Sequence, residues 1–193
     1  MIILGIDPGT IVLGYGVVHL DGKNLKCLAL DAVKLDPKKD PFERLRDIHE
    51  VLGQLFESYQ PDFLAMEAPF FGKNIQSMLK LGRAQGVIMS AGLAKGIPVD
   101  EYSPRKVKQS ITGNGAASKE QVCRMLQSMY GLKDLPKLLD ATDGLAVATC
   151  HAHALLSPLP LGNSVNKKPS TKGKRKGSWS QFLEKNPERE VKN

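Results

Sequence analysis

The first eighteen residues constrain the fold of this chain more than any other stretch. Residues 1–6 form a short apolar run rich in β-branched side chains, long enough for one buried strand. Asp7 lies at the carboxyl end of this run, and Pro8-Gly9-Thr10 then interrupts the pattern as a tight turn. Residues 11–18 resume as a second strand, so we expect the two strands to pair as a hairpin. A carboxylate held by a rigid turn at the end of a central strand is well placed to bind a cation.

The order of the remaining elements predicts an α/β fold with a mixed sheet. A third strand is expected at 25–35, and later strands at 63–66 and 97–102 alternate with helices. The helices are expected to begin near Pro41, Asn74, Ser103, Ser118 and Pro136, the last ending near Leu156. Three consecutive strands followed by alternation indicate an antiparallel meander beside parallel crossovers. Ligands of such sheets bind at the carboxyl ends of the parallel strands.

Helix start signals are clear at two places. Asp40 is a typical N-cap, with proline at the first helical position and Glu43 three residues after the cap. Ser118 and Gln121 form a second capping box. The first of these helices should bury one apolar face, made of Phe42, Leu45, Ile48, Leu52, Leu55, Phe56 and Tyr59.

Charge and composition divide the chain into two parts. Of the net charge of +7, residues 157–193 carry nine Lys or Arg against three Asp or Glu, so the body is close to neutral. We expect one domain over 1–156 and a basic, disordered tail over 157–193. Any nucleic-acid binding by the body must therefore depend on locally placed cations.

Composition also predicts a cytoplasmic protein. No stretch approaches the apolar run of a membrane span, and Met1 leads directly into the first strand, so neither a membrane segment nor a signal peptide is expected. Cys27, Cys123 and Cys150 lack metal-binding or redox spacing, which indicates reduced thiols.

Four acidic residues are the candidate metal-binding and catalytic residues of the chain. Glu67 follows a short buried strand, as Asp7 does, and Asp140 and Asp143 lie on the last helix. A spacing of three residues turns a helix by about 300 degrees, so these two carboxylates leave the same face. An all-oxygen set suits Mg²⁺ or Mn²⁺, and two ions about 3.5–4 Å apart can assist phosphodiester hydrolysis.

Several motifs resemble those of the RuvC family of bacterial Holliday-junction resolvases. They are Gly5-Ile6-Asp7-Pro8-Gly9, Glu67 followed by Phe70, Lys80-Leu81-Gly82-Arg83-Ala84-Gln85-Gly86, and Asp140-Ala141-Thr142-Asp143 with His151. The resemblance spans residues 1–156. It implies a ribonuclease H-like fold with a five-stranded sheet covered by helices on both faces. It also implies a homodimer and Mg²⁺-dependent paired nicking of four-way junction DNA in recombination and repair. Gly144 departs from the family, where alanine is usual after the last acid, and should weaken the helix slightly.

The resemblance also assigns roles to residues. The family's four acids map onto Asp7, Glu67, Asp140 and Asp143, which implies that these residues are catalytic. We expect them to bind two Mg²⁺ ions, which Mn²⁺ can replace, with Asp7 bridging the ions. The family's junction-contacting lysines map onto Lys108 and Lys119, and its base-stacking phenylalanine maps onto Phe70. Arg105, on the same short helix as Lys108, completes the expected DNA-binding set. A RuvA-RuvB branch-migration complex is the implied partner in the bacterial cytoplasm.

Two other functions compete with a nuclease. One is a junction-binding module that does not cut, with structural acids. The other is a kinase-like ATPase, because Gly5-Ile6-Asp7-Pro8-Gly9-Thr10 also resembles its first phosphate loop, although the second domain and second phosphate motif are lacking. His151 lies eleven residues from Asp140, a rise of about 16 Å on one helix, so it should pack in the core or support a ligand residue rather than share their metal.

Overall fold

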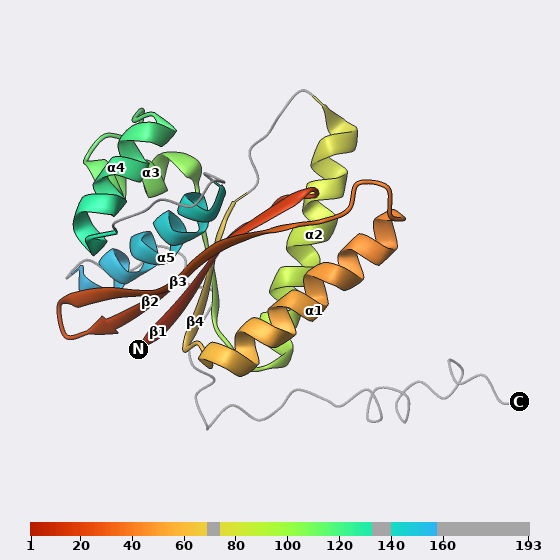
Figure 1. Cartoon of the computed structure of the whole chain (residues 1–193), viewed down its shortest axis with the longest axis horizontal. Helices are drawn as coiled ribbons and strands as arrows, with labels where there is room; N and C mark the ends of the chain where they lie inside the picture. The colour runs from red at the N-terminus through yellow and green to blue at the C-terminus, as the bar shows by residue number, and fades with distance from the viewer. Residues whose placement is uncertain (69–73, 133–139, 158–193) are drawn as a thin grey trace, which may run out of the picture.

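The computed structural model describes residues 1–68, 74–132 and 140–157 (Figure 1). The strands within these ranges are β1 (Ile2–Asp7), β2 (Val12–Asp21), β3 (Asn24–Lys34), β4 (Phe63–Glu67) and β5 (Val99–Tyr102). The helices are α1 (Pro41–Tyr59), α2 (Ile75–Ala94), α3 (Pro104–Thr112), α4 (Lys119–Tyr130) and α5 (Asp140–Leu156). The expected strands and helices are thus confirmed in order and type. The expected first turn of the last helix, the tail beyond residue 157 and Phe70 lie outside the described residues.

The five strands form one mixed sheet in the order β3-β2-β1-β4-β5. β1 pairs antiparallel with β2, and β2 pairs antiparallel with β3, which confirms the predicted meander. β4 lies parallel to β1, and β5 lies parallel to β4. Because Ile6 pairs with Met66, the next residue of each strand, Asp7 and Glu67, ends at the same edge of the sheet.

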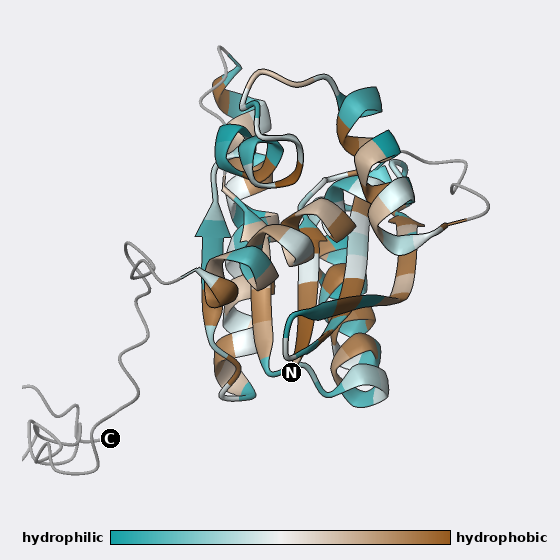
Figure 2. Cartoon of the chain, turned by 90° about the vertical axis from the view of Figure 1, so that its left-hand side faces the viewer, coloured by the Kyte–Doolittle hydropathy of each residue, from teal (hydrophilic) through white to brown (hydrophobic). Residues whose placement is uncertain are grey.

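Helices cover both faces of the sheet. α1 and α2 lie on one face, and α3, α4 and α5 lie on the other (Figure 1). The side chains of Leu4 and Ile6 pack with α1 and α2, whereas Ile3 packs with α5. Since side chains alternate between the two faces of a strand, Asp7 points to the α5 side. Figure 2 shows the hydrophobic residues concentrated along the strands, between the two helical layers.

Local signals set the helix boundaries as expected, with one error on α1. Asp40 and Glu43 form a complete capping box, and so do Ser118 and Gln121. The buried residues of α1 are Ile48, Leu52, Leu55 and Phe56. The prediction that Phe42 belongs to the buried face is wrong, because its side chain is 71% exposed. Helical spacing fixes the direction of a first-turn side chain but not whether the sheet extends beneath it.

α5 lies directly against the backbone of β1 and β2. A Cβ atom added to Gly14 would overlap the carbonyl oxygen of Asp140, and one added to Gly16 would overlap Cα of Leu145. Gly5 of β1 likewise meets the carbonyl oxygen of Gly144. A Cβ atom added to Gly144 itself would overlap Cα of Tyr15 in β2, so in this chain Gly144 does more than weaken the helix: it lets the helix backbone approach the strand directly after the last acid.

Gly16→Ala should lower the free energy of unfolding by about 1–3 kcal/mol, because an overpacked contact with backbone cannot relax by a rotamer change. Urea denaturation followed by circular dichroism measures this. The matched control is Gly53→Ala in α1, where nothing lies within 4 Å of the added methyl group. It should keep or raise stability by up to about 1 kcal/mol. Equal denaturation midpoints for the two variants would contradict the close packing of α5.

His151 is a core residue of α5, as one of the two expected alternatives had it. Its side chain has 0% exposure, its Nδ1 lies 2.9 Å from the Tyr102 hydroxyl, and its ring packs against Phe63. The carboxylate of Asp100 is 3.9 Å from Nδ1. Burial lowers the pKa of His151 to about 4.

This pKa makes stability pH-dependent. The unfolded chain takes up a proton near pH 6.5, whereas the folded protein takes it up only near pH 4, so acidification between these values favours the unfolded state. The loss should be about 3 kcal/mol. His151→Gln keeps an acceptor for the Tyr102 hydroxyl but does not titrate, so its unfolding free energy should fall less between pH 7 and pH 4. Urea denaturation measures both values. If the unfolding free energies of the two proteins fall by the same amount between pH 7 and pH 4, the pKa of His151 is not the cause.

None of the helices in the described ranges is long and apolar enough to cross a membrane. Cys27, Cys123 and Cys150 are free thiols, as their spacing indicated.

Candidate active site

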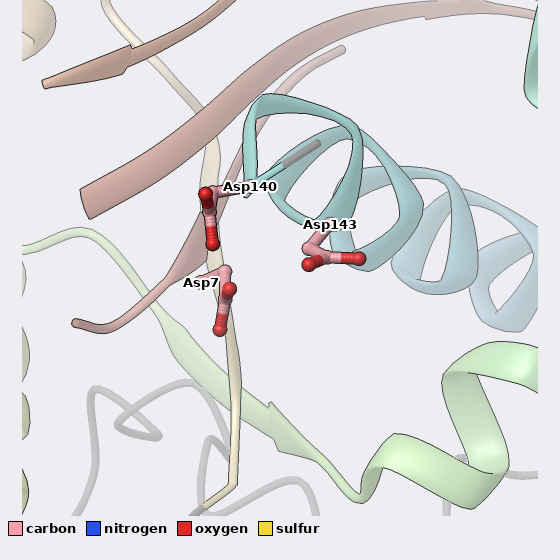
Figure 3. A group of neighbouring side chains, drawn as sticks. All are labelled: Asp7, Asp140 and Asp143. Atoms are coloured by element: carbon pink, nitrogen blue, oxygen red, sulfur yellow. The ribbon is translucent and has the colours of Figure 1, made fainter. Parts of the chain in front are cut away.

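Three carboxylates meet at the carboxyl edge of the sheet. Asp7 ends β1, and Asp140 and Asp143 lie in the first turn of α5. One oxygen from each lies within 4.8 Å of the others. Figure 3 shows the two α5 side chains leaving one side of the helix toward Asp7, as their spacing predicted.

Glu67 stands beside this group rather than within it. Its side chain lines one hollow together with Asp7 and Asp143. The end of β4 that carries it is fixed from two sides. Gln85 of α2 donates to the Glu67 carbonyl at 3.2 Å, and the backbone N–H of Ala68 donates to Tyr102 at 2.9 Å. The four acids of the sequence prediction therefore lie at one place, three of them in direct proximity.

Burial and mutual repulsion act on these carboxylates together. Burial raises the pKa of Asp7 to about 7, with further contributions from Glu67 and Asp143. Burial also raises the pKa of Glu67, and the charge on Asp143 adds to it. The pKa of Asp143 is raised by burial too, although Lys119 opposes the effect. Such a group binds either protons or a cation in preference to carrying its full negative charge.

Lys119 is part of the acidic site, which the sequence did not reveal. Its Nζ donates to Oδ2 of Asp143 at 2.6 Å, across 24 residues of sequence. Burial works against the charged ammonium, but the hydrogen bond and the nearby carboxylates outweigh it and raise the pKa of Lys119. Lys108 of α3 lines the same hollow. Both lysines expected to contact DNA are therefore at the carboxylates, where a bound phosphate would need them.

The other two expected DNA-binding residues have different outcomes. Arg105 is exposed on α3 and lines a neighbouring hollow with Lys108 and Gly115. It lies on the same side of the sheet as the acids but is not among the residues lining their hollow. Phe70 lies outside the described residues, between β4 and α2.

The residues fit a divalent cation. All the side-chain donors of the cluster are carboxylate oxygens, which are the ligands that Mg²⁺, Mn²⁺ and Ca²⁺ prefer. The raised pKa of Asp7 records the electrostatic cost of holding these groups together, and a cation would relieve that cost. Zn²⁺, a borderline metal, is bound mostly by thiolate or imidazole ligands, and the cluster contains neither.

The sheet order, the helices on both faces and the carboxylates at the sheet edge are those of the ribonuclease H-like class, and the family match shows that the chain is a nuclease of this class. The family model of crossover junction endodeoxyribonuclease RuvC matches residues 3–151. Two curated relatives with that name come from Bacteroides fragilis and Christiangramia forsetii. The first is 50% identical over 190 residues, covering 97% of this chain and 95% of the relative. The second is 48% identical over 188 residues, covering 97% and 92%. The chain belongs to the RuvC family.

Solved structures agree with this assignment. RuvC of T. thermophilus in complex with Holliday junction substrate superposes with a TM-score of 0.74 and 36% identity, covering 79% of this chain and 93% of that one. The yeast mitochondrial Holliday junction resolvase Ydc2 shares the fold, with a TM-score of 0.60 at 12% identity over 78% of this chain and 77% of its own.

Asp7→Asn should raise the free energy of unfolding of the metal-free protein by a few kcal/mol at pH 8, because each unit by which folding raises the pKa costs about 1.4 kcal/mol when the group is ionised. The folded-state pKa lies above the unfolded one, so the cost is full above pH 7 and declines as the pH falls through 7. The difference in unfolding free energy between Asp7→Asn and the wild type should therefore be smaller at pH 5 than at pH 8. Mg²⁺ should raise the thermal midpoint of the wild type more than that of the variant.

The measurement is urea denaturation in EDTA at both pH values, with thermal melts at increasing Mg²⁺. The control is Asp21→Asn, which removes an exposed carboxylate at the far end of β2 and should change neither quantity. If Asp7→Asn were less stable than the wild type at pH 8, Asp7 would have a stabilising partner and would not be electrostatically strained.

Proposed function

We propose that this protein resolves Holliday junctions as a structure-specific endonuclease, nicking two strands of four-way junction DNA in recombination and repair. The observation that carries the proposal is the meeting of Asp7, Asp140 and Asp143 at the sheet edge in a chain of the RuvC family. The T. thermophilus relative, which is bound to a Holliday junction, supports the choice of substrate.

The carboxylates hold the catalytic cation in this proposal. Asp7, Asp140 and Asp143 supply its ligands, and Glu67 completes the set from the adjacent strand end. We assign Mg²⁺ as the natural ion, two ions per site, with Mn²⁺ as a substitute; the all-oxygen donor set supports this choice. When bound, such ions activate water and stabilise the negative charge that develops on the leaving oxygen.

The chain's own cations serve the DNA. We assign Lys119 and Lys108 to contact the phosphate backbone next to the cut, and their position in the lining of the hollow of the carboxylates supports this role. Arg105 extends this positive surface along α3. Phe70, in the segment that follows Glu67, is assigned to stack on an unpaired base. Binding of this kind depends on phosphates and shape rather than on base sequence.

Two symmetric nicks need two sites, and we propose a homodimer. A stripe along α2 supports it, with exposed Ile75 and Leu79 followed at helical spacing by Gly82 and Gly86, beside which nothing lies within 4 Å. Small and apolar residues at such spacing allow two helices to pack closely.

We further assign the protein to the bacterial cytoplasm as a single nuclease domain with a basic tail, working with the RuvA-RuvB branch-migration complex.

The decisive experiment compares a synthetic mobile four-way junction with a linear duplex of matched sequence, with Mg²⁺ and in EDTA. Paired nicks in the junction alone, dependent on Mg²⁺, are expected from the wild type. Asp7→Asn should lower the cleavage rate by at least a hundredfold, because it removes one ligand charge from the centre of the cluster. Its affinity for the junction should stay within a few-fold of the wild type, since the binding cations are untouched.

Glu50→Gln, at an exposed carboxylate of α1, is the control and should cut like the wild type. Sedimentation of the same preparations reports whether the chain is dimeric. Tight junction binding without cutting in Mg²⁺ or Mn²⁺ would assign the chain as a binding module. Normal cleavage by Asp7→Asn would refute the assignment of the site.

A further inference from the structure

A second charged hollow lies on the opposite face of the sheet, between α1 and α2. It is lined by the positively charged side chains of Arg44, Lys80 and Arg83, together with Thr10, Pro41 and apolar residues of the two helices. Lys80 and Arg83 are exposed and three residues apart on α2, so they share one side of that helix. None of the residues lining this hollow is acidic.

The charges of this hollow are not neutralised within the described part of the chain. α2 carries no acidic residue. The acids in the first turns of α1 have other partners: Asp40 and Glu43 form the capping box, and Asp47 pairs with Lys39 at 2.8 Å. Like charges at this spacing repel by a few tenths of a kcal/mol, so the arrangement does not serve stability. An anion would relieve it.

Arg44 links the hollow to the turn that follows the strand carrying Asp7. Its Nη1 donates to the carbonyl oxygen of Thr10 at 3.1 Å, three residues after Asp7. Its Nε is buried and has no hydrogen-bond acceptor among the described residues. A single hydrogen bond therefore satisfies only part of this guanidinium, a group with five N–H donors that suits phosphate oxygens.

The position of the hollow matches that of the carboxylates along the sheet. The turn at Thr10 follows the carboxyl end of β1, so the hollow and the acidic cluster lie at the same edge and are separated by the sheet. A DNA strand that crosses this edge would present different phosphates to the two sides.

We propose that the hollow formed by Arg44, Lys80 and Arg83 binds one phosphate of the DNA backbone, remote from the phosphate that is cut. The proposal rests on the proposed junction-binding function. The contact carries no base specificity and adds affinity and orientation to the complex.

The test measures junction affinity by fluorescence anisotropy in EDTA, where cutting does not interfere, between 50 and 200 mM salt. Each phosphate contact contributes a slope of about 0.9 to the logarithm of affinity against the logarithm of salt. Lys80→Gln combined with Arg83→Gln should weaken binding at 50 mM salt and lower this slope by about one. The variant should then lose about three- to fourfold less affinity over this salt range than the wild type.

Lys95→Gln is the matched control, because it removes an exposed cation at the other end of the same helix. It should leave affinity and slope unchanged. If the wild type binds the junction and the double variant shows the same affinity and slope as Lys95→Gln, the proposal is wrong. The proposed nuclease function is not affected by that result. Absence of junction binding by the wild type itself would instead refute the proposed function.

A small phosphate ligand is the other source of the same chemistry, and a second arm separates the two. Thermal midpoints are compared in inorganic phosphate and in chloride at equal ionic strength, for the wild type and the double variant. If phosphate stabilises only the wild type while the DNA slopes agree, the hollow is a phosphate site but does not bind the DNA backbone.

Discussion

The backbone contact between α5 and the hairpin of β1 and β2 is the constraint on which the site depends. Glycines on both sides of this contact let the helix lie on the sheet without intervening side chains. The contact at Gly14 falls at Asp140, the first residue of α5 and the first acid of the cluster. The position of Asp140 and Asp143 relative to Asp7 is therefore set by rigid backbone packing rather than by flexible side chains. A metal site requires this, because its ligands must converge from separate elements.

The same packing holds together groups that repel one another. Burial and neighbouring acids raise the pKa of Asp7, so the charged site lowers the stability of the metal-free protein. Two buried apolar clusters, one on each face of the sheet, offset this cost. Lys119 offsets a further part through its hydrogen bond to Asp143. The site thus has the character expected of functional centres, where charge is held in place at the expense of stability.

Local patterns in the sequence predicted most of the fold. Two capping boxes, two acids at strand ends and two acids three residues apart on a helix each follow from short-range rules, and the structure bears out their positions. The bond between Lys119 and Asp143 could not be predicted in this way, since it joins two helices and depends on the angle at which they meet. The exposure of Phe42 likewise depends on where the sheet ends. The role of Gly144 emerges only when the strand beneath it is known.

In the proposed function, a nearly neutral body would bind DNA through the placement of its cations rather than through its net charge. Most of the excess positive charge lies in the tail, beyond residue 156. Within the body, Lys108 and Lys119 lie beside the acids on one face of the sheet, and Lys80 and Arg83 lie near the same edge on the other. The alternation of side chains along β1 separates the two sets, because Asp7 faces α5 while its neighbour Ile6 packs against α1 and α2. The carboxylates and the cations of the hollow formed by Arg44, Lys80 and Arg83 thus share one sheet edge but lie on opposite faces of the sheet. Lys119 differs from the cations of that hollow, because its Nζ is hydrogen-bonded to Oδ2 of Asp143. If Lys119 contacts a phosphate as we propose, it must share or give up this bond, and metal binding and DNA binding would then be coupled through Asp143.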